Sequence, residues 1–323
     1  MDFFNIILWP IKWAIEAILV AFHWVFSSIG MDPDSGLTWV LSIVGLVLVI
    51  RALLIPIFVR QIKSQRKMLE VAPELKKIQA KYKGKKDQFS REAMSRETME
   101  LYKRTGTNPL SSCLPLLLQM PIFFGLYSVL LNAQHEGIGV GLLNKTLSKS
   151  FGESIFFGAP LKLAISTSSE AAKIVGGSTV AVVVIASVMV VLMTGSQFIT
   201  QLQIMSKNQS PEMKSSPMYK QQRMLLYVLP LVFAFSGFTF PLGVMFYWLV
   251  SNFWTMGQQF VVIRNMPTPG SEAALAREAR LAKQRQRRGI TIIEDAPTEE
   301  PELPKSTQRS QPVNSKNRKK KKR

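Results

Sequence analysis

The stretch GLTWVLSIVGLVLVIRALLIPIFV, residues 36–59, decides the fold class of this chain. It is long and apolar enough to cross a lipid bilayer as a helix, and its one charged residue is Arg51. If residues 37–59 form the span, Arg51 lies about 5 Å past the midpoint at a rise of about 1.5 Å per residue. A guanidinium at that depth costs about 2.5–3.5 kcal/mol, so we expect it to face water or a partner. The alternative is an arginine that snorkels to the nearer interface.

Four other stretches have the length and the apolar character of membrane spans. They are residues 114–134, 179–200, 224–240 and 242–262. Only Pro241 separates the last two, which therefore form a tight transmembrane hairpin over residues 224–262. The sequence thus predicts an all-α polytopic membrane protein with a five-helix transmembrane core, in which Arg51 is the only Lys, Arg, Asp or Glu.

The charges of the loops predict the orientation of these spans. The chain carries 40 Lys and Arg against 21 Asp and Glu, and residues 60–113 alone hold 14 of these basic residues and 6 of the acidic ones. Residues 201–223 and 264–323 are also basic, whereas residues 135–178 are nearly balanced. The positive-inside rule places the three basic segments and the C-terminus in the cytoplasm and makes residues 135–178 an extracytoplasmic loop.

Residues 3–29 form an apolar run with a polar stripe. The polar residues of the stripe recur at spacings of 7, 4, 7 and 4, and they are Asn5, Lys12, Glu16, His23 and Ser27. On a helix they share one side, where Lys12 and Glu16 are spaced for an i,i+4 pair. Two interpretations stay open, an amphipathic helix in the outer membrane interface and an additional span.

The basic segments contain further predicted helices. Residues 60–113 are expected to form a cytoplasmic helical hairpin, with a break or kink near Pro73 and a second helix over 88–104. The tail, residues 264–323, begins with a basic helix over 271–288 and then has a composition typical of disorder. Anionic lipid headgroups and ribosomal RNA are its two natural partners. The lysine run has no interleaved aromatic residues, so we expect no specific DNA binding.

Nothing in the sequence favours an enzyme or a coupled transporter. There is no HExxH motif, no Cys/His cluster and only one cysteine, and GIGVG at 137–141 lacks the strand and helix of a dinucleotide site. Ion-coupled carriers usually place Asp, Glu or His within their spans, and the five predicted spans have none. We therefore expect no catalytic residues, no cofactor and no metal.

The stretch LYKRTGTNPLSSCLPLLLQMPIFFGLYSVL, residues 101–130, resembles the signature of the YidC/Oxa1/Alb3 family of membrane protein insertases. The upstream span with Arg51 and the final hairpin FPLGVMFYWLVSNFWTMGQQ, residues 240–259, occur in the order and spacing of that family. The resemblance covers roughly residues 3–263. The chain lacks both a large periplasmic domain and a lipoprotein-type signal, which points to an actinobacterial type of member.

The resemblance implies a protein of the bacterial plasma membrane that inserts and helps to fold nascent membrane proteins, alone or with the Sec translocon. In that family a groove, hydrophilic and open to the cytoplasm and to lipid, receives the client. Arg51 matches the arginine of the groove and Trp248 matches an aromatic groove position in YWLVSN, beside Tyr247. Gln119, Asn252 and either Gln197 or Gln201 are further candidates, and the alternative for each is an interhelical hydrogen bond.

Overall fold

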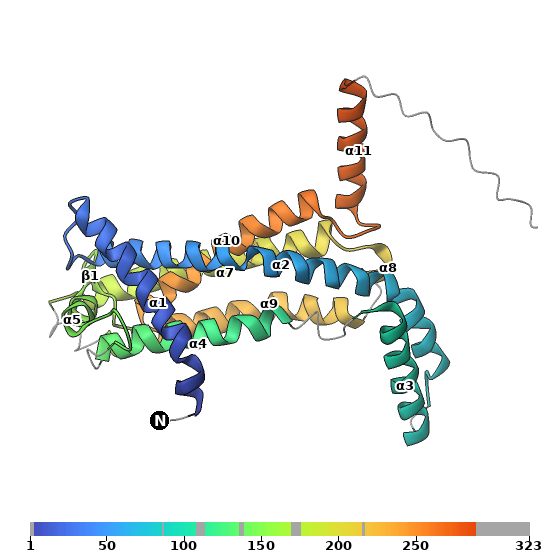
Figure 1. Ribbon diagram of the computed structural model, residues 1–323, viewed down its shortest axis with the longest axis horizontal. Helices are drawn as coiled ribbons and strands as arrows, with labels where there is room; N and C mark the ends of the chain where they lie inside the picture. The colour runs from blue at the N-terminus through green and yellow to red at the C-terminus, as the bar shows by residue number, and fades with distance from the viewer. Residues whose placement is uncertain are drawn as a thin grey trace, which may run out of the picture. The chain divides into compact units, whose positions relative to one another are not determined.

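The computed structural model describes residues 3–85, 87–107, 114–135, 139–168, 176–214 and 217–288, and most of them are helical (Figure 1). The helices are α1 (Phe3–Ser28), α2 (Gly36–Lys81), α3 (Gln88–Thr105), α4 (Leu114–His135), α5 (Lys145–Glu153), α7 (Thr179–Lys207), α8 (Pro211–Lys214), α9 (Pro217–Thr239), α10 (Leu242–Asn265) and α11 (Glu272–Arg287). Between α5 and α7 lie β1 (Ile155–Phe156), β2 (Ala159–Pro160) and the short 3₁₀ helix η2 (Ile165–Thr167).

Among the described residues, three stretches are long and apolar enough to cross a membrane. They are Leu8–Ser28 in α1, Gly36–Ser64 in α2 and Thr179–Lys207 in α7. The N-terminal stretch is therefore long enough to span, although Figure 1 shows α1 crossing the long helices obliquely instead of running parallel to them.

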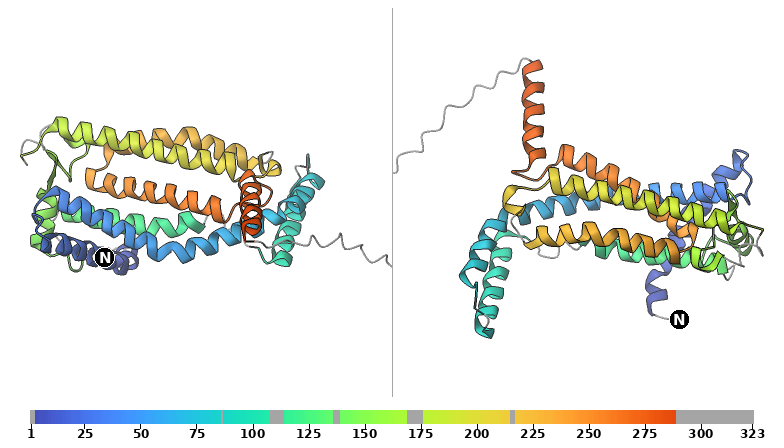
Figure 2. Two further views of the ribbon diagram at one scale, coloured as in Figure 1. Left: turned by 90° about the horizontal axis from the view of Figure 1, so that it is seen from above. Right: turned by 180° about the vertical axis from the view of Figure 1, so that it is seen from behind.

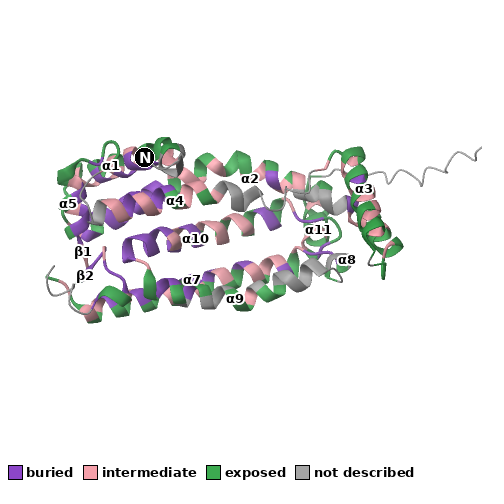
Figure 3. Cartoon of the chain, turned by 90° about the horizontal axis from the view of Figure 1, so that it is seen from below, coloured by how far each residue is buried: buried purple, intermediate pink, exposed green. Residues whose placement is uncertain are grey.

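Helix α10 is the central element of the bundle. It packs against α7 on one side and against α2 on the other, and both Figure 2 and Figure 3 show it between these helices. Helix α9 packs on α7, and α1 covers α2 and α4. The starts of α2, α7 and α10 and residues 139–168 lie at one end of the bundle, which we call the loop end.

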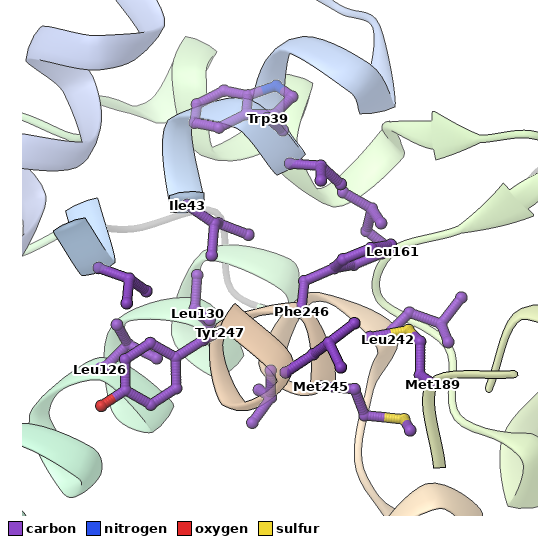
Figure 4. Close-up of a cluster of buried hydrophobic side chains, with 14 of the residues drawn as sticks. Trp39, Ile43, Leu126, Leu130, Leu161, Met189, Leu242, Met245, Phe246 and Tyr247 are labelled. Atoms are coloured by element: carbon purple, nitrogen blue, oxygen red, sulfur yellow. The ribbon is translucent and has the colours of Figure 1, made fainter. Parts of the chain in front are cut away.

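The hydrophobic core lies toward the loop end. Figure 4 shows Trp39 and Ile43 of α2, Leu126 of α4 and Met245 of α10 in this cluster, and all four side chains are fully buried. Residues 139–168 seal it, because the N–H groups of Leu242 and Gly243 donate hydrogen bonds to the carbonyls of Leu163 (3.0 Å) and Leu161 (2.9 Å). Residues 139–168 of the predicted extracytoplasmic loop are thus an ordered segment tied to the start of α10.

Helix α1 turns its polar stripe toward the protein. Lys12, Glu16 and His23 are buried, whereas Trp9, Trp13 and Trp24 are exposed; the Asn5 side chain lies outside the described residues. The amphipathic prediction therefore identified the correct stripe. Its polar face binds other parts of the chain, and its apolar face points outward.

Helices α2 and α3 form an antiparallel pair beyond the bundle. Asp87 caps the start of α3 and Gly106, with φ of 61°, ends it, while Arg104 pairs with Glu74 across the two helices. Of the break or kink expected near Pro73, the break does not occur, because α2 is one continuous helix from Gly36 to Lys81. Proline removes one backbone donor, and the Pro73 side chain itself is exposed. Figure 1 shows α2 changing direction as it leaves the bundle.

Candidate functional site

Arg51 is held by the central helix. Its Nη2 donates a hydrogen bond to Ser251 Oγ of α10 at 3.0 Å, and its side chain is half-buried. The guanidinium is thus bound to a neighbouring helix within the candidate membrane span of α2. This geometry disfavours the snorkelling interpretation, in which the side chain reaches for the interface.

A second polar contact joins α10 to α4. Gln119 Nε2 donates a hydrogen bond to Tyr247 Oη at 2.9 Å. Tyr247 precedes Ser251 by four residues, so the two side chains share one side of α10. The polar residues of α2 and α4 therefore meet the same side of the central helix, one turn apart.

The other predicted site residues have different surroundings. Trp248 packs among aromatic rings, with centroids 5.8 Å from Phe123, 5.3 Å from Phe233 and 6.1 Å from Phe240. Asn252 is buried, and its Nδ2 has no hydrogen-bond partner among the described residues. The structure therefore places Trp248 in a packed aromatic cluster and leaves a buried amide donor on the same helix.

The two glutamines of α7 remain undistinguished. Both Gln197 and Gln201 are half-buried, and neither side chain forms a hydrogen bond with another described residue. The buried polar residues of this helix are Ser196 and Thr200, whose hydroxyls donate to carbonyls of α7 itself. Those two hydroxyls serve their own helix, so they provide no contact between helices.

Burial changes abruptly along both helices at the Arg51–Ser251 contact. In α2, most residues from 38 to 47 are buried, and none from 48 to 60 is. In α10, most residues from 242 to 252 are buried, and none from 253 to 261 is. Arg51 therefore lies just beyond the point where close packing between the helices ends.

Sequence reasoning missed two polar contacts that organise the loop end. The N–H groups of Val140, Gly141 and Leu143 donate to the Glu16 carboxylate at 2.8, 2.6 and 3.4 Å. His23 Nε2 lies 2.8 Å from the carbonyl oxygen of Pro33, so this nitrogen carries the proton. The closely spaced glycines of GIGVG, residues 137–141, were the one sequence feature that could have indicated a backbone able to curve around the Glu16 carboxylate.

The pair of α2 and α3 carries an open surface cleft of about 790 Å³ with mixed charge. At its rim Lys81 and Tyr82 donate hydrogen bonds to Glu97, and these contacts lower the pKa of the Glu97 carboxyl. The described residues contain no group of three His, Cys, Asp or Glu side chains placed to bind a metal ion.

Comparison with known proteins assigns the family. The profile of the family described as 60Kd inner membrane protein matches residues 30–269. A protein of Tropheryma whipplei (strain Twist) is 46% identical over 284 residues, which cover 88% of this chain and 92% of the relative. A protein of Streptomyces avermitilis is 46% identical, and the match covers 87% of this chain and 63% of the relative. A protein of Bifidobacterium longum is 34% identical, and the match covers 97% of this chain and 95% of the relative. All three relatives are named membrane protein insertase YidC.

The apolar helices and the bacterial relatives together mark this chain as a protein of the bacterial membrane. It belongs to the 60Kd inner membrane protein family, the YidC/Oxa1 family.

Proposed function

We propose that this chain is a membrane protein insertase and chaperone, as its relatives are named. Its client is a nascent membrane protein, which enters a hydrophilic groove lined by α2, α4, α7 and α10. The observation that carries the proposal is the position of Arg51: the only charge in the apolar part of α2 lies where the buried packing of α2 and α10 ends. Below that contact the helices are packed together, and beyond it polar and half-buried side chains are available to a client.

The proposed mechanism is electrostatic. A polar flank of a client must cross about 30 Å of hydrocarbon, and a wet groove reaching partway in shortens the low-dielectric path. The Arg51 guanidinium attracts acidic residues of the flank, and the Ser251 hydroxyl holds it at that depth. The half-buried Gln119, Gln197 and Gln201 supply polar groups along the path. The buried Tyr247 holds Gln119 through their hydrogen bond, and the aromatic cluster of Trp248 supplies an apolar wall. The apolar part of the client then leaves sideways into lipid.

The orientation and the partners belong to the same proposal. The basic segments 60–113, 201–223 and 264–323 support a cytoplasmic location for the α2–α3 pair and the C-terminus. We propose that α1 lies in the opposite interface with its tryptophans toward lipid, since its polar stripe is occupied by the protein. The Sec translocon is a proposed partner for larger clients, and anionic lipids are proposed partners of the basic segments.

The test of insertase activity uses proteoliposomes that contain this protein alone. A single-span client with a short translocated flank is synthesised in their presence, and protease protection of the flank is scored. We expect protection above that of empty liposomes and of liposomes that hold an unrelated polytopic membrane protein. Protection equal to these controls would contradict autonomous insertion and favour an accessory of the Sec translocon.

The basic tail gives a separate prediction about ribosome binding. Helix α11 is exposed and basic, and the preceding segment is fixed because the Thr268 N–H donates to Asn208 Oδ1 at 2.8 Å. A chain that ends at Ser271 keeps this contact and should co-sediment less with ribosomes, with the remaining binding less sensitive to salt. Replacing the five basic residues of α11 by glutamine separates its contribution from that of residues 289–323. Unchanged co-sedimentation of the shortened chain would remove the ribosome from the proposed partners.

A further inference from the structure

The turn between β1 and β2 presents an aromatic side chain in a strained conformation. The two strands pair in antiparallel register, Ile155 with Pro160 and Phe156 with Ala159. The two turn residues, Phe157 and Gly158, have φ of 48° and 81°. Positive φ at both positions is typical of a tight hairpin turn, where asparagine or glycine is favoured and a bulky aromatic residue is an outlier. Phe157 is nevertheless 79% exposed, so burial of its ring does not explain its presence.

The surrounding structure fixes this turn. The Ser178 N–H donates to the Gly158 carbonyl at 2.8 Å, and the Leu161 N–H donates to the Ser154 carbonyl at 3.1 Å. The ring of Phe156 packs on Phe246 of the core, with centroids 5.0 Å apart, and Phe157 lies edge-on to Phe156. The exposed Phe157 ring is therefore held in a fixed position by contacts with the core at the loop end.

The turn lies beside the first turn of α7. A Cβ atom added to Gly158 would be 3.6 Å from the Cβ of Ala181, and the neighbouring Val180 is 70% exposed. Val180 begins an exposed apolar row that continues through Val183, Val184, Val188 and Val191, within the candidate membrane span of α7. Phe157 thus extends a surface that faces lipid if α7 spans the bilayer.

The local sequence is also suited to the boundary between lipid and water. Residues 154–161, SIFFGAPL, contain no charged residue, and Lys162 follows them. Trp24, Ile29, Leu37 and Leu142 are further large apolar side chains that are exposed at the loop end. Exposed apolar side chains gathered at one end of a membrane bundle are typical of contact with the interfacial region of a leaflet.

We propose that Phe157 and Val180 form an anchor in the bilayer leaflet at the loop end, with the Phe157 ring inserted among the lipid chains next to the headgroups. The strained turn holds the ring in that position. The partner of this surface is lipid and not another protein. The proposal is independent of the insertase function, since it requires only that α7 crosses the membrane.

Site-specific fluorescence in proteoliposomes tests the anchor. The single native cysteine, Cys113, is replaced by serine, and one cysteine is introduced by Phe157→Cys, Val180→Cys or Phe89→Cys and labelled with an environment-sensitive dye. Phe89 is the matched control, because it is the same residue type, is 86% exposed and lies on α3 beyond the bundle. Quenching is measured with lipids that carry a nitroxide at a shallow or a deep position of the acyl chain.

We expect labels at 157 and 180 to emit to the blue of the label at 89 and to be quenched more by the shallow nitroxide than by the deep one. Val180→Cys keeps the test valid if cysteine perturbs the turn, because residue 180 is helical. Labels at 157 and 180 that emit like the label at 89 would show a water-exposed turn and overturn the proposal. A blue-shifted label at 157 that lipid nitroxides do not quench would also overturn it, because protein would then cover the ring.

Discussion

Replacing Arg51 with alanine is expected to lower insertion of a client with an acidic translocated flank roughly tenfold, about 1.4 kcal/mol in the barrier. The physical reason is the loss of one charge pair: at about 6 Å and an effective dielectric constant of about 40, such a pair contributes roughly 1.4 kcal/mol. A client whose flank carries no acidic residue should be affected by less than about twofold, because it loses no such pair. The measurement is the initial rate of protease protection for both clients in proteoliposomes of equal protein content.

Two variants show whether the charge or the local structure is responsible. Arg51→Lys keeps the charge and should retain most of the insertion of the acidic client. Ser251→Ala removes the hydroxyl that accepts from Arg51 Nη2, so it should lower insertion of the acidic client by a smaller factor than Arg51→Ala. In the Arg51→Ala background, Ser251→Ala should have no further effect, because the effects of substituting two residues of one hydrogen-bonded pair do not add. Equal losses for both clients would contradict the electrostatic mechanism and leave the insertase proposal standing.

The second large effect concerns stability. Glu16→Ala is expected to destabilise the protein by about 3 kcal/mol, because hydrogen bonds to a charged group contribute roughly 1.5–3 kcal/mol and the buried N–H of Leu143 is left unpaired. The Glu16 side chain is only 1% exposed, and it accepts from the N–H groups of Val140, Gly141 and Leu143. The measurement is the midpoint of thermal unfolding in detergent, which should fall clearly below that of the unmodified protein.

A nearby glutamate provides the control for this effect. Glu153→Ala makes the same chemical change at a carboxylate that is 61% exposed and lies 3.9 Å from the Lys149 ammonium. Such exposed pairs contribute about 0–1 kcal/mol, so its unfolding midpoint should hardly move. Gly141→Ala tests the same contact from the loop, because an added Cβ would lie 2.5 Å from the Trp13 ring. If Glu16→Ala and Glu153→Ala had equal effects, the backbone contacts of Glu16 would not hold α1 to residues 139–143.

The sequence predicted the helices more readily than their contacts. A long apolar run predicts a helix from composition alone, and helices cover all six apolar stretches of the chain. Contacts between residues distant in sequence left no such signal. Ser251 lies 200 residues from Arg51, and in the sequence it looks like any serine that packs between helices. The stripe on α1 was visible in the residue spacing, but periodicity does not say which structure the stripe faces. At Pro73 the sequence left a break and a kink open, and α2 continues as one helix that changes direction as it leaves the bundle.

The continuity of α2 connects the bundle to the α2–α3 pair through a single helix. Thirty residues of unbroken helix separate Arg51 from Lys81, where the chain turns into α3. At about 1.5 Å per residue this stretch of helix is roughly 45 Å long along its axis, and it changes direction where it leaves the bundle. A ligand that pulls on the α2–α3 pair therefore acts on the same helix that carries the arginine. Docking at the distant pair is thus connected to the guanidinium by an unbroken helix that bends on the way.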